Sequence, residues 1–172
     1  ITSLRVVGEK DFIDVAWKKA FSSGSFVGPD LYTCGWFITT TAGHFLKSGC
    51  AVEVDGVTEY LRVIREQIKN GVDFIKLNLT GGVMGPDWDK MPNTFPTDDE
   101  LKAAFGLCHQ RGFKIVAHAG GLDGIKKAVE YGAHTLEHGY QLDDDSVEML
   151  SKSSIYFVPT LSLTHMNRGE DF

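Results

Sequence analysis

The chain has 172 residues, of which 42% are hydrophobic and 23% are charged, as is ordinary for a globular protein with a sizeable core. The formal net charge is -6 and no run of Lys and Arg stands out, so nucleic acid and anionic membrane surfaces are not expected as partners. The longest apolar stretches have the length of strands, which argues against a membrane-spanning helix.

The ends of the chain indicate whether it is part of a longer protein, and its cysteines indicate the redox compartment. The sequence begins without Met, shows no signal-peptide pattern at Ile1, and ends on NRGEDF, which closes no element. We therefore expect it to be a piece of a longer protein. Cys34, Cys50 and Cys108 are odd in number and far apart, which favours buried thiols in a reducing compartment and a cytoplasmic protein.

Short β-like runs alternate with amphipathic helical segments along the chain. The predicted strands are residues 3–8, 31–39, 73–79, 114–119, 134–139 and 155–163. The predicted helices are residues 11–23, 55–71, 97–112, 122–132 and 144–152. Thr97 and Glu100 have the spacing of a capping box. Strict alternation of strands and helices predicts an α/β fold with a parallel sheet covered by helices.

The architecture that these elements favour is a barrel. A doubly wound sheet would favour a Gly-rich turn after the first strand, and residues 3–12 have none. We predict a (β/α)₈ TIM-type barrel over residues 1–172, incomplete because six strands and five helices fall short of eight units. The loop 81–96 is long and rich in Gly and Pro, so it is a candidate functional loop, and Trp88 within it is predicted to line a pocket.

Two apolar runs end in histidine and glycine, namely KIVAHAGG (114–121) and TLEHG (135–139). On adjacent parallel strands, His118 and His138 would lie side by side at the carboxyl edge, where α/β folds bind ligands. Either histidine alone is more typical of a core residue, but the pair indicates part of a metal site. Glu137 is predicted to face the other way and to be structural or to orient a neighbouring group.

Lys76 is the third candidate. In DFIKLNL, alternation places Phe74, Lys76 and Asn78 toward the barrel interior. A lysine there can reach the barrel mouth and stay solvated or ion-paired. A desolvated lysine can instead form a Schiff base, and a neutral amine can take up carbon dioxide to give a carbamate that bridges two cations.

Three further positions are candidates for substrate binding. His44 follows the 31–39 run in a Gly-flanked loop, where a substrate contact and an ordinary loop histidine are equally consistent with the sequence. Gly81 and Gly82 follow the strand of Lys76, where their backbone amides could form an anion-binding nest.

The chain resembles the amidohydrolase superfamily, specifically its imidazolonepropionase-like and prolidase-like branch. The resemblance rests on residues 28–44, 71–86, 114–139 and 155–162, with the FIK, AHA and EHG elements in this order and spacing. It implies a barrel of which this chain carries strands 2–7, a small-molecule substrate, and hydrolysis of an amide or other C–N bond by water activated by zinc. One or two ions are implied, and other divalent metals are alternatives.

The resemblance also implies roles for single residues. Lys76 matches a lysine that is typically carboxylated and bridges two zinc ions, His118 and His138 match metal ligands, and His44 matches a histidine that can contact substrate. The family's first-strand HxH motif, its eighth-strand aspartate and its β-sandwich have no counterpart in this chain.

Two other functions remain open from the sequence. One is a metal-free Schiff-base lyase or aldolase that uses Lys76, although such chemistry needs neither His118 nor His138. The other is a catalytically incomplete fragment that folds through self-association as a homo-oligomer, because open sheet edges invite pairing with another chain.

Overall fold

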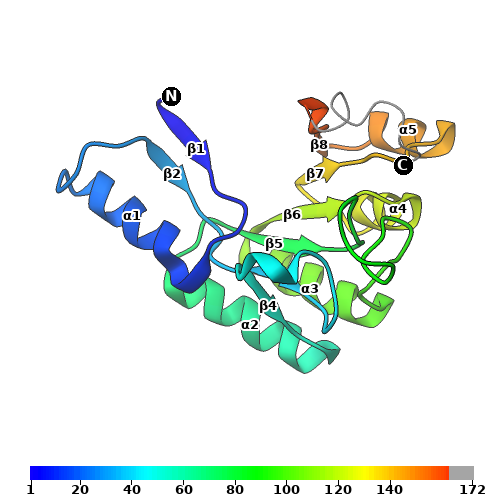
Figure 1. Ribbon diagram of the computed structural model, residues 1–172, viewed down its shortest axis with the longest axis horizontal. Coiled ribbons are helices and arrows are strands. Elements are labelled where there is room, and N and C mark those ends of the chain that lie inside the picture. Colours follow the sequence, from blue (N-terminus) through cyan, green and yellow to red (C-terminus); the bar gives the residue numbers. More distant parts are fainter. Residues whose placement is uncertain (163–172) are drawn as a thin grey trace.

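The computed structural model describes residues 1–162, and its centre is a six-stranded parallel sheet (Figure 1). The spatial order of the strands is β4-β3-β5-β6-β7-β8. Their bounds are β3 Phe37–Thr39, β4 Ala51–Glu53, β5 Phe74–Asn78, β6 Lys114–Ala119, β7 Thr135–His138 and β8 Tyr156–Val158. β1 (Ser3–Arg5) and β2 (Asp30–Tyr32) pair only with each other. The predicted α/β fold with a parallel sheet is confirmed.

All five predicted helices are present. They are α1 Ile13–Ser22, α2 Gly56–Asn70, α3 Asp98–Arg111, α4 Leu122–Glu130 and α5 Asp144–Ser151. Two short 3-10 helices, η1 (Lys10–Phe12) and η2 (Leu46–Ser48), lie in the connections. The capping box of α3 forms as predicted, because Thr97 Oγ1 accepts a hydrogen bond from Glu100 N and Glu100 Oε2 accepts one from Thr97 N. None of the helices in residues 1–162 is both long and apolar enough to cross a membrane.

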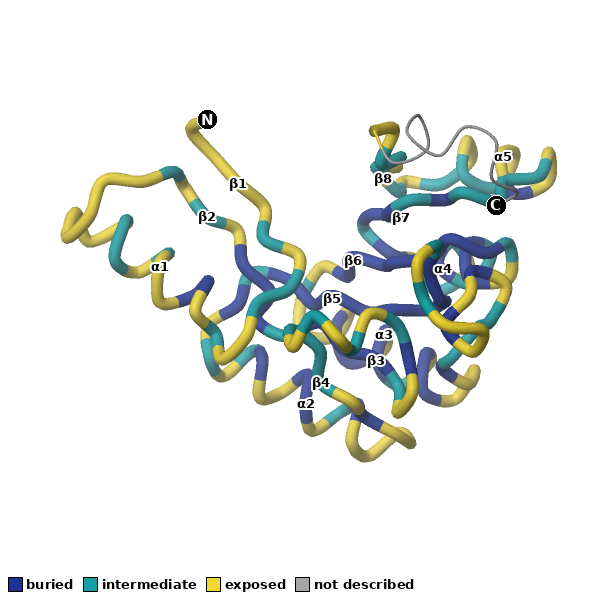
Figure 2. The backbone as a smooth tube through the Cα atoms, viewed as in Figure 1, coloured by how far each residue is buried: buried dark blue, intermediate teal, exposed yellow. Residues whose placement is uncertain are grey.

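The outer face of β5, β6 and β7 packs against the helices and forms the main core (Figure 2). Each of its strand residues and the adjoining Leu79 is no more than 1% exposed: Ile75, Leu77, Leu79, Ile115, Ala117, Ala119 and Leu136. Burial of these aliphatic groups is the main force that fixes the three strands in register. The opposite face of the same strands is thereby directed to the interior of the curved sheet.

The predicted strand 31–39 is wrong in one respect, because the structure divides it between two sheets. β2 ends at Tyr32 and β3 begins at Phe37. Between them the carboxylate of Asp14 accepts hydrogen bonds from the backbone N of Cys34 and Gly35, at 3.1 and 2.9 Å, and Gly35 has φ of +64°. At this bend the buried Asp14 carboxylate takes the place of a neighbouring strand as hydrogen-bond acceptor, and the left-handed conformation of Gly35 allows the backbone to turn.

The edge strand β4 was not predicted. It has three residues and pairs in parallel with β3, and so short a run shows no periodicity by which to recognise it. The last predicted strand is shorter than expected, since β8 ends at Val158, and residue 163 lies outside the described residues.

Candidate active site

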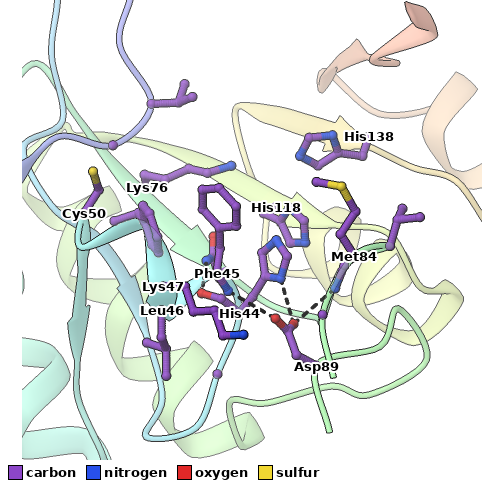
Figure 3. Close-up of a pocket in the computed structure, with 18 of the residues that line it drawn as sticks. His44, Phe45, Leu46, Lys47, Cys50, Lys76, Met84, Asp89, His118 and His138 are labelled. Atoms are coloured by element: carbon purple, nitrogen blue, oxygen red, sulfur yellow. Dashed lines mark hydrogen bonds and ion pairs between the residues drawn. The ribbon is translucent and has the colours of Figure 1, made fainter. Parts of the chain in front are cut away.

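A cavity of about 510 Å³ opens at the carboxyl ends of β5, β6 and β7 (Figure 3). Lys76, His118 and His138 line it, together with His44 and Gly82 from the connecting loops. Trp88 of the 81–96 loop also lines the cavity, as predicted. The structure therefore gathers at one cavity all the residues that the sequence singled out for the site except Gly81, which does not line it. Their roles as ligands or catalytic groups remain predictions.

The pleat of β5 and β6 explains the positions of Lys76 and His118. Asn78 is in register with His118, and Lys76 is in register with Val116, so Lys76 and His118 project from the same inner face. Both side chains are buried, at 5% exposed. The imidazole rings of His118 and His138 meet edge to face with centroids 4.6 Å apart.

The side chains of β7 differ from the prediction. Glu137 is in register with His118 and therefore lies on the inner face rather than facing away. His138 would alternate to the outer face, but its φ of +78° breaks the strand geometry. This left-handed backbone turns the imidazole back to the cavity, and such conformations in residues other than glycine often occur at functional sites.

Glu137 has a defined set of partners inside the sheet. Arg5 of β1 donates two hydrogen bonds to its carboxylate, at 3.0 and 2.7 Å, and Thr135 donates a third at 2.6 Å. Arg5 also donates to Thr135 Oγ1 at 3.1 Å. Because the Arg5 pair is bidentate, it holds the otherwise separate β1 against the inner face of β7.

Burial lowers the pKa of the Lys76 ammonium to about 8. The negative charge of Glu137 opposes this shift and the positive charge of Arg5 adds to it. A lysine with a depressed pKa has a larger fraction of free amine near neutral pH than an exposed one. The site therefore increases the fraction of Lys76 in the amine form, which can react with a carbonyl compound or with carbon dioxide.

The histidines of the cavity are also shifted toward their neutral forms. Burial lowers the pKa of His118 well below its ordinary value, and His44, Lys76 and His138 add to the effect. Burial and the neighbouring Lys76 lower the pKa of His138 to about 4. Neutral imidazole is the form that ligates a metal ion.

Hydrogen bonds fix which nitrogen of His118 is free. Its Nε2 lies 3.1 Å from the carbonyl oxygen of Gly81, and because a carbonyl can only accept, Nε2 carries the proton and Nδ1 keeps its lone pair. In His138, Nδ1 lies 2.7 Å from Thr160 Oγ1, which leaves Nε2 free of any hydrogen bond within residues 1–162. Such outer partners are typical of metal-ligating histidines.

The donor set fits a metal ion in part. His118 Nδ1 and His138 Nε2 are free imidazole nitrogens on adjacent strands, and Lys76 lies beside them (Figure 3). Among residues 1–162, however, no group of three or more His, Cys, Asp or Glu side chains could hold a metal ion alone. A tetrahedral ion here would need further ligands, such as a modified Lys76, water or additional residues.

The predicted anion nest is not formed. Gly81 N donates to Asn93 O, and Gly82 N donates to the backbone and side-chain oxygens of Asp89. These amides are used to fold the 81–96 loop onto itself, so they do not point together at a ligand. Gly82 still has a steric role, because a Cβ at this position would collide with the His44 ring.

Asp89 is the site residue that the sequence did not reveal. It is buried in the 81–96 loop and its Oδ1 lies 2.7 Å from His44 Nδ1. The ring of His44 in turn stacks on that of His118, with centroids 4.2 Å apart. The two residues are 45 apart in sequence, and the only available signal was an acidic residue within a long loop at the carboxyl edge.

Solved structures similar to this chain confirm the barrel-type fold. A Xaa-Pro dipeptidase with bound methionine superposes with a TM-score of 0.87 and 29% identity, over 96% of this chain and 44% of that chain. The ochratoxinase of Aspergillus niger gives a TM-score of 0.86 with 29% identity, over 96% of this chain and 42% of that chain. These relatives are TIM-type barrels, and this chain forms part of such a barrel.

Sequence comparison agrees with the structural comparison. The curated ochratoxinase sequence of Aspergillus niger is 29% identical over 168 residues, which cover 84% of this chain and 35% of that protein. The chain thus spans about a third of the length of this curated relative. Residues 1–169 match the profile described as the amidohydrolase family. The chain therefore belongs to the amidohydrolase family.

Proposed function

We propose that the protein to which this chain belongs is a metal-dependent hydrolase of amide or other C–N bonds. The observation that carries the proposal is the convergence of Lys76, His118 and His138 on one cavity at the carboxyl ends of adjacent strands. Family membership and the similarity to an ochratoxinase and a Xaa-Pro dipeptidase support it. The substrate would be a small amide such as a dipeptide, an N-acyl amino acid or a cyclic amide.

The residues that would hold the metal are His118 through Nδ1, His138 through Nε2, and Lys76 as its carbamate. Zinc is the ion proposed, since two neutral imidazoles are ligands that it prefers. A divalent cation in such a site lowers the pKa of water and polarises a carbonyl oxygen. The carbamate on Lys76 would replace a buried cation with an anion, which matches the positive charge of the ions beside it.

His44 and apolar residues of the loops that line the cavity would bind the substrate. The His44 ring lies against His118 at the cavity wall, where it can contact a bound amide. Phe45, Met84 and Trp88 provide apolar surface at the same cavity. Apolar walls with a few polar groups are typical of small-molecule sites, in which burial supplies affinity and the polar groups supply orientation.

Metal binding and hydrolysis should be tested together. Zinc-edge anomalous scattering from crystals of the protein should give a peak about 2.0–2.1 Å from His118 Nδ1 and His138 Nε2. Hydrolysis of a panel of Xaa-Pro dipeptides and N-acyl amino acids should be lost with a chelator and restored by zinc. His118→Asn should lose both the zinc and the activity, whereas His109→Asn, a change to an exposed histidine of α3, should lose neither.

Two outcomes would contradict the proposal. One is a zinc peak on other residues while the cavity histidines carry none, and the other is hydrolysis that survives complete metal removal. A Schiff-base lyase is the second candidate, favoured by the lowered pKa of Lys76. Borohydride would trap a carbonyl substrate on Lys76 covalently in a lyase and would leave a hydrolase unmodified.

The cellular setting of this function is also a proposal. We place the protein in the cytoplasm, because its three cysteines are free thiols, two of them buried. We propose neither nucleic acid nor a membrane as a partner, because the chain is acidic. A homo-oligomer is proposed from the edge strands β4 and β8 of the described sheet. Sedimentation equilibrium should show a dimer or larger species, and a monomer at all concentrations would contradict the oligomer.

A further inference from the structure

Two loops that are distant in sequence meet at the wall of the cavity through one carboxylate. Asp89 Oδ1 lies 2.7 Å from His44 Nδ1, and Asp89 Oδ2 accepts a hydrogen bond from the backbone N of Phe45 at 3.2 Å. Gly82 N donates to Oδ1 at 3.3 Å. Asp89 is 5% exposed, so these contacts occur with little competition from water.

The contact determines the tautomer of His44. An ionised carboxylate only accepts hydrogen bonds, so the proton of the neutral ring lies on Nδ1. His44 Nε2 then keeps its lone pair and makes no hydrogen bond within residues 1–162, while the ring lines the cavity (Figure 3). Asp89 thus sets which nitrogen of His44 is offered to a ligand, as a carboxylate does for a histidine in many enzymes.

The surroundings hold the ring in one place as well as in one tautomer. The absence of a side chain at Gly82 lets the 81–96 loop lie directly against His44, and His118 stacks on the ring with centroids 4.2 Å apart. The backbone N of His44 also donates to Thr39 Oγ1 at 3.1 Å. Rotation of His44 away from Asp89 would take from a buried carboxylate its shortest hydrogen bond and leave it only the two longer backbone ones, which is unfavourable.

We propose that Asp89 is a positioning residue of the active site, which holds the His44 ring with Nδ1–H on its carboxylate and Nε2 directed to the substrate. This inference rests on the proposed hydrolase function, because it assigns His44 a substrate contact. It also gives the 81–96 loop a role, since the loop carries the residue that orients a side chain from a different βα connection.

The tautomer should be measured first, because this readout does not depend on activity. Nitrogen-15 NMR of the histidine rings, with His44 assigned by a His44→Gln variant, should show Nδ1 protonated and Nε2 bare. In Asp89→Ala the proton of His44 should redistribute between both nitrogens. Asp87→Ala is the matched control, because Asp87 is an exposed carboxylate of the same loop, and its His44 spectrum should be unchanged.

Kinetics should then separate positioning from loop folding. Asp89→Ala should lower kcat/KM by roughly 10- to 100-fold, as loss of a partner that orients an active-site histidine does, and Asp89→Asn, which retains one acceptor oxygen, should lose less. In a His44→Ala background, Asp89→Ala should have no further effect, because a residue that acts through His44 has nothing left to orient.

Three results would overturn the inference. They are an Asp89→Ala loss of kcat/KM that persists undiminished without His44, a His44 proton that stays on Nδ1 in Asp89→Ala, and an Asp87→Ala effect as large as that of Asp89→Ala. If Asp89→Ala fails to fold, the Asp89→Asn variant carries the same double-variant test. If the wild-type protein hydrolyses no amide, the proposed function fails, while the NMR measurement still decides the role of Asp89.

Discussion

The two faces of β5, β6 and β7 differ in the kind of side chain that they bury. The outer face carries only aliphatic side chains that are almost fully buried against helices, such as Leu77 and Ile115. The inner face of the same strands carries Lys76, His118 and Glu137, which are also buried, at 5% exposed each, but are polar. One face stabilises the fold by removing apolar surface from water, and the other places polar groups that are costly to bury around the cavity where the proposed chemistry would use them.

The contrast shows that burial alone does not distinguish a core from a site. Lys76 and His118 are each 5% exposed, a value that would suit a core residue. What distinguishes them is that burial shifts their titration, with the pKa of Lys76 lowered to about 8 and that of His118 lowered well below its usual value. Perturbed titration combined with a cavity is characteristic of functional sites.

The largest expected effect is the loss of activity on removing the amine of Lys76, which lies on the inner face. Lys76→Met should lower kcat/KM by at least about 10³-fold, which is about 4 kcal/mol of transition-state stabilisation. The free energy of unfolding should stay the same or rise, because a buried amine has been replaced by an apolar group of similar length. Steady-state kinetics and urea unfolding measure the two quantities.

The matched control for Lys76→Met is Lys114→Met, which changes an exposed lysine at the opposite end of β6. It should leave kcat/KM within about twofold, as expected for a surface position. Activity retained in Lys76→Met would remove the functional distinction between the two faces.

On the outer face, the effect should be on stability. Leu77→Ala should lower the free energy of unfolding by about 3 kcal/mol, because it deletes a side chain that is 1% exposed and leaves a cavity. Val57→Ala, on a partly exposed residue of α2, should change it by less than about 0.5 kcal/mol. Zinc stoichiometry should be unaffected in both, and its loss in Leu77→Ala would show that the faces are not independent.

The inner face should also make stability depend on pH. The pKa of His138 is about 4 in the folded protein and about 6.5 when unfolded, so the unfolded state binds more protons between these values. The contribution of His138 to the free energy of unfolding of the metal-free protein should therefore fall by about 2 to 3 kcal/mol as pH drops from 6.5 to 4. His118 and His44, whose pKa values are also lowered, act in the same direction. Urea unfolding at a series of pH values checks this.

A His138→Phe variant should have a flatter profile over the same range, because it removes the group that gains a proton on unfolding. Leu77→Ala should keep the wild-type slope at lower overall stability. Equal slopes in wild type and His138→Phe would assign the acid sensitivity to other groups.

The smallest expected effect is on the ion pair that joins β1 to the inner face. Arg5→Met should lower the free energy of unfolding by about 1 to 2 kcal/mol, because it removes the two hydrogen bonds that Arg5 donates to the buried Glu137 carboxylate and leaves only the one from Thr135. Arg62→Met, which breaks an exposed pair within α2, should cost less than about 0.5 kcal/mol. Equal effects in the two variants would mean that Glu137 is satisfied without Arg5.

The sequence by itself determined the five helices, the strands β5, β6 and β7, and the meeting of Lys76, His118 and His138 at one cavity. Period-2 alternation placed Lys76 inside and Leu77 outside, and the spacing of the two His-Gly runs brought His118 and His138 to one edge, because parallel strands joined by one helix have few other arrangements. Local signals such as the Thr97–Glu100 capping box depend on neighbouring residues alone and were confirmed.

The tertiary structure decided what depends on contacts between distant residues. The bend after β2 needs Asp14 to bind Cys34 and Gly35. Glu137 faces inward because of the register of β7 with β6, and His138 faces the same side because its left-handed backbone turns the ring back to the cavity. The pairing of Asp89 with His44 joins loops that are 45 residues apart. Periodicity predicts which face of a strand or helix each side chain occupies. It does not predict which loop packs against which, because loop packing depends on side-chain contacts that exist only after the chain has folded.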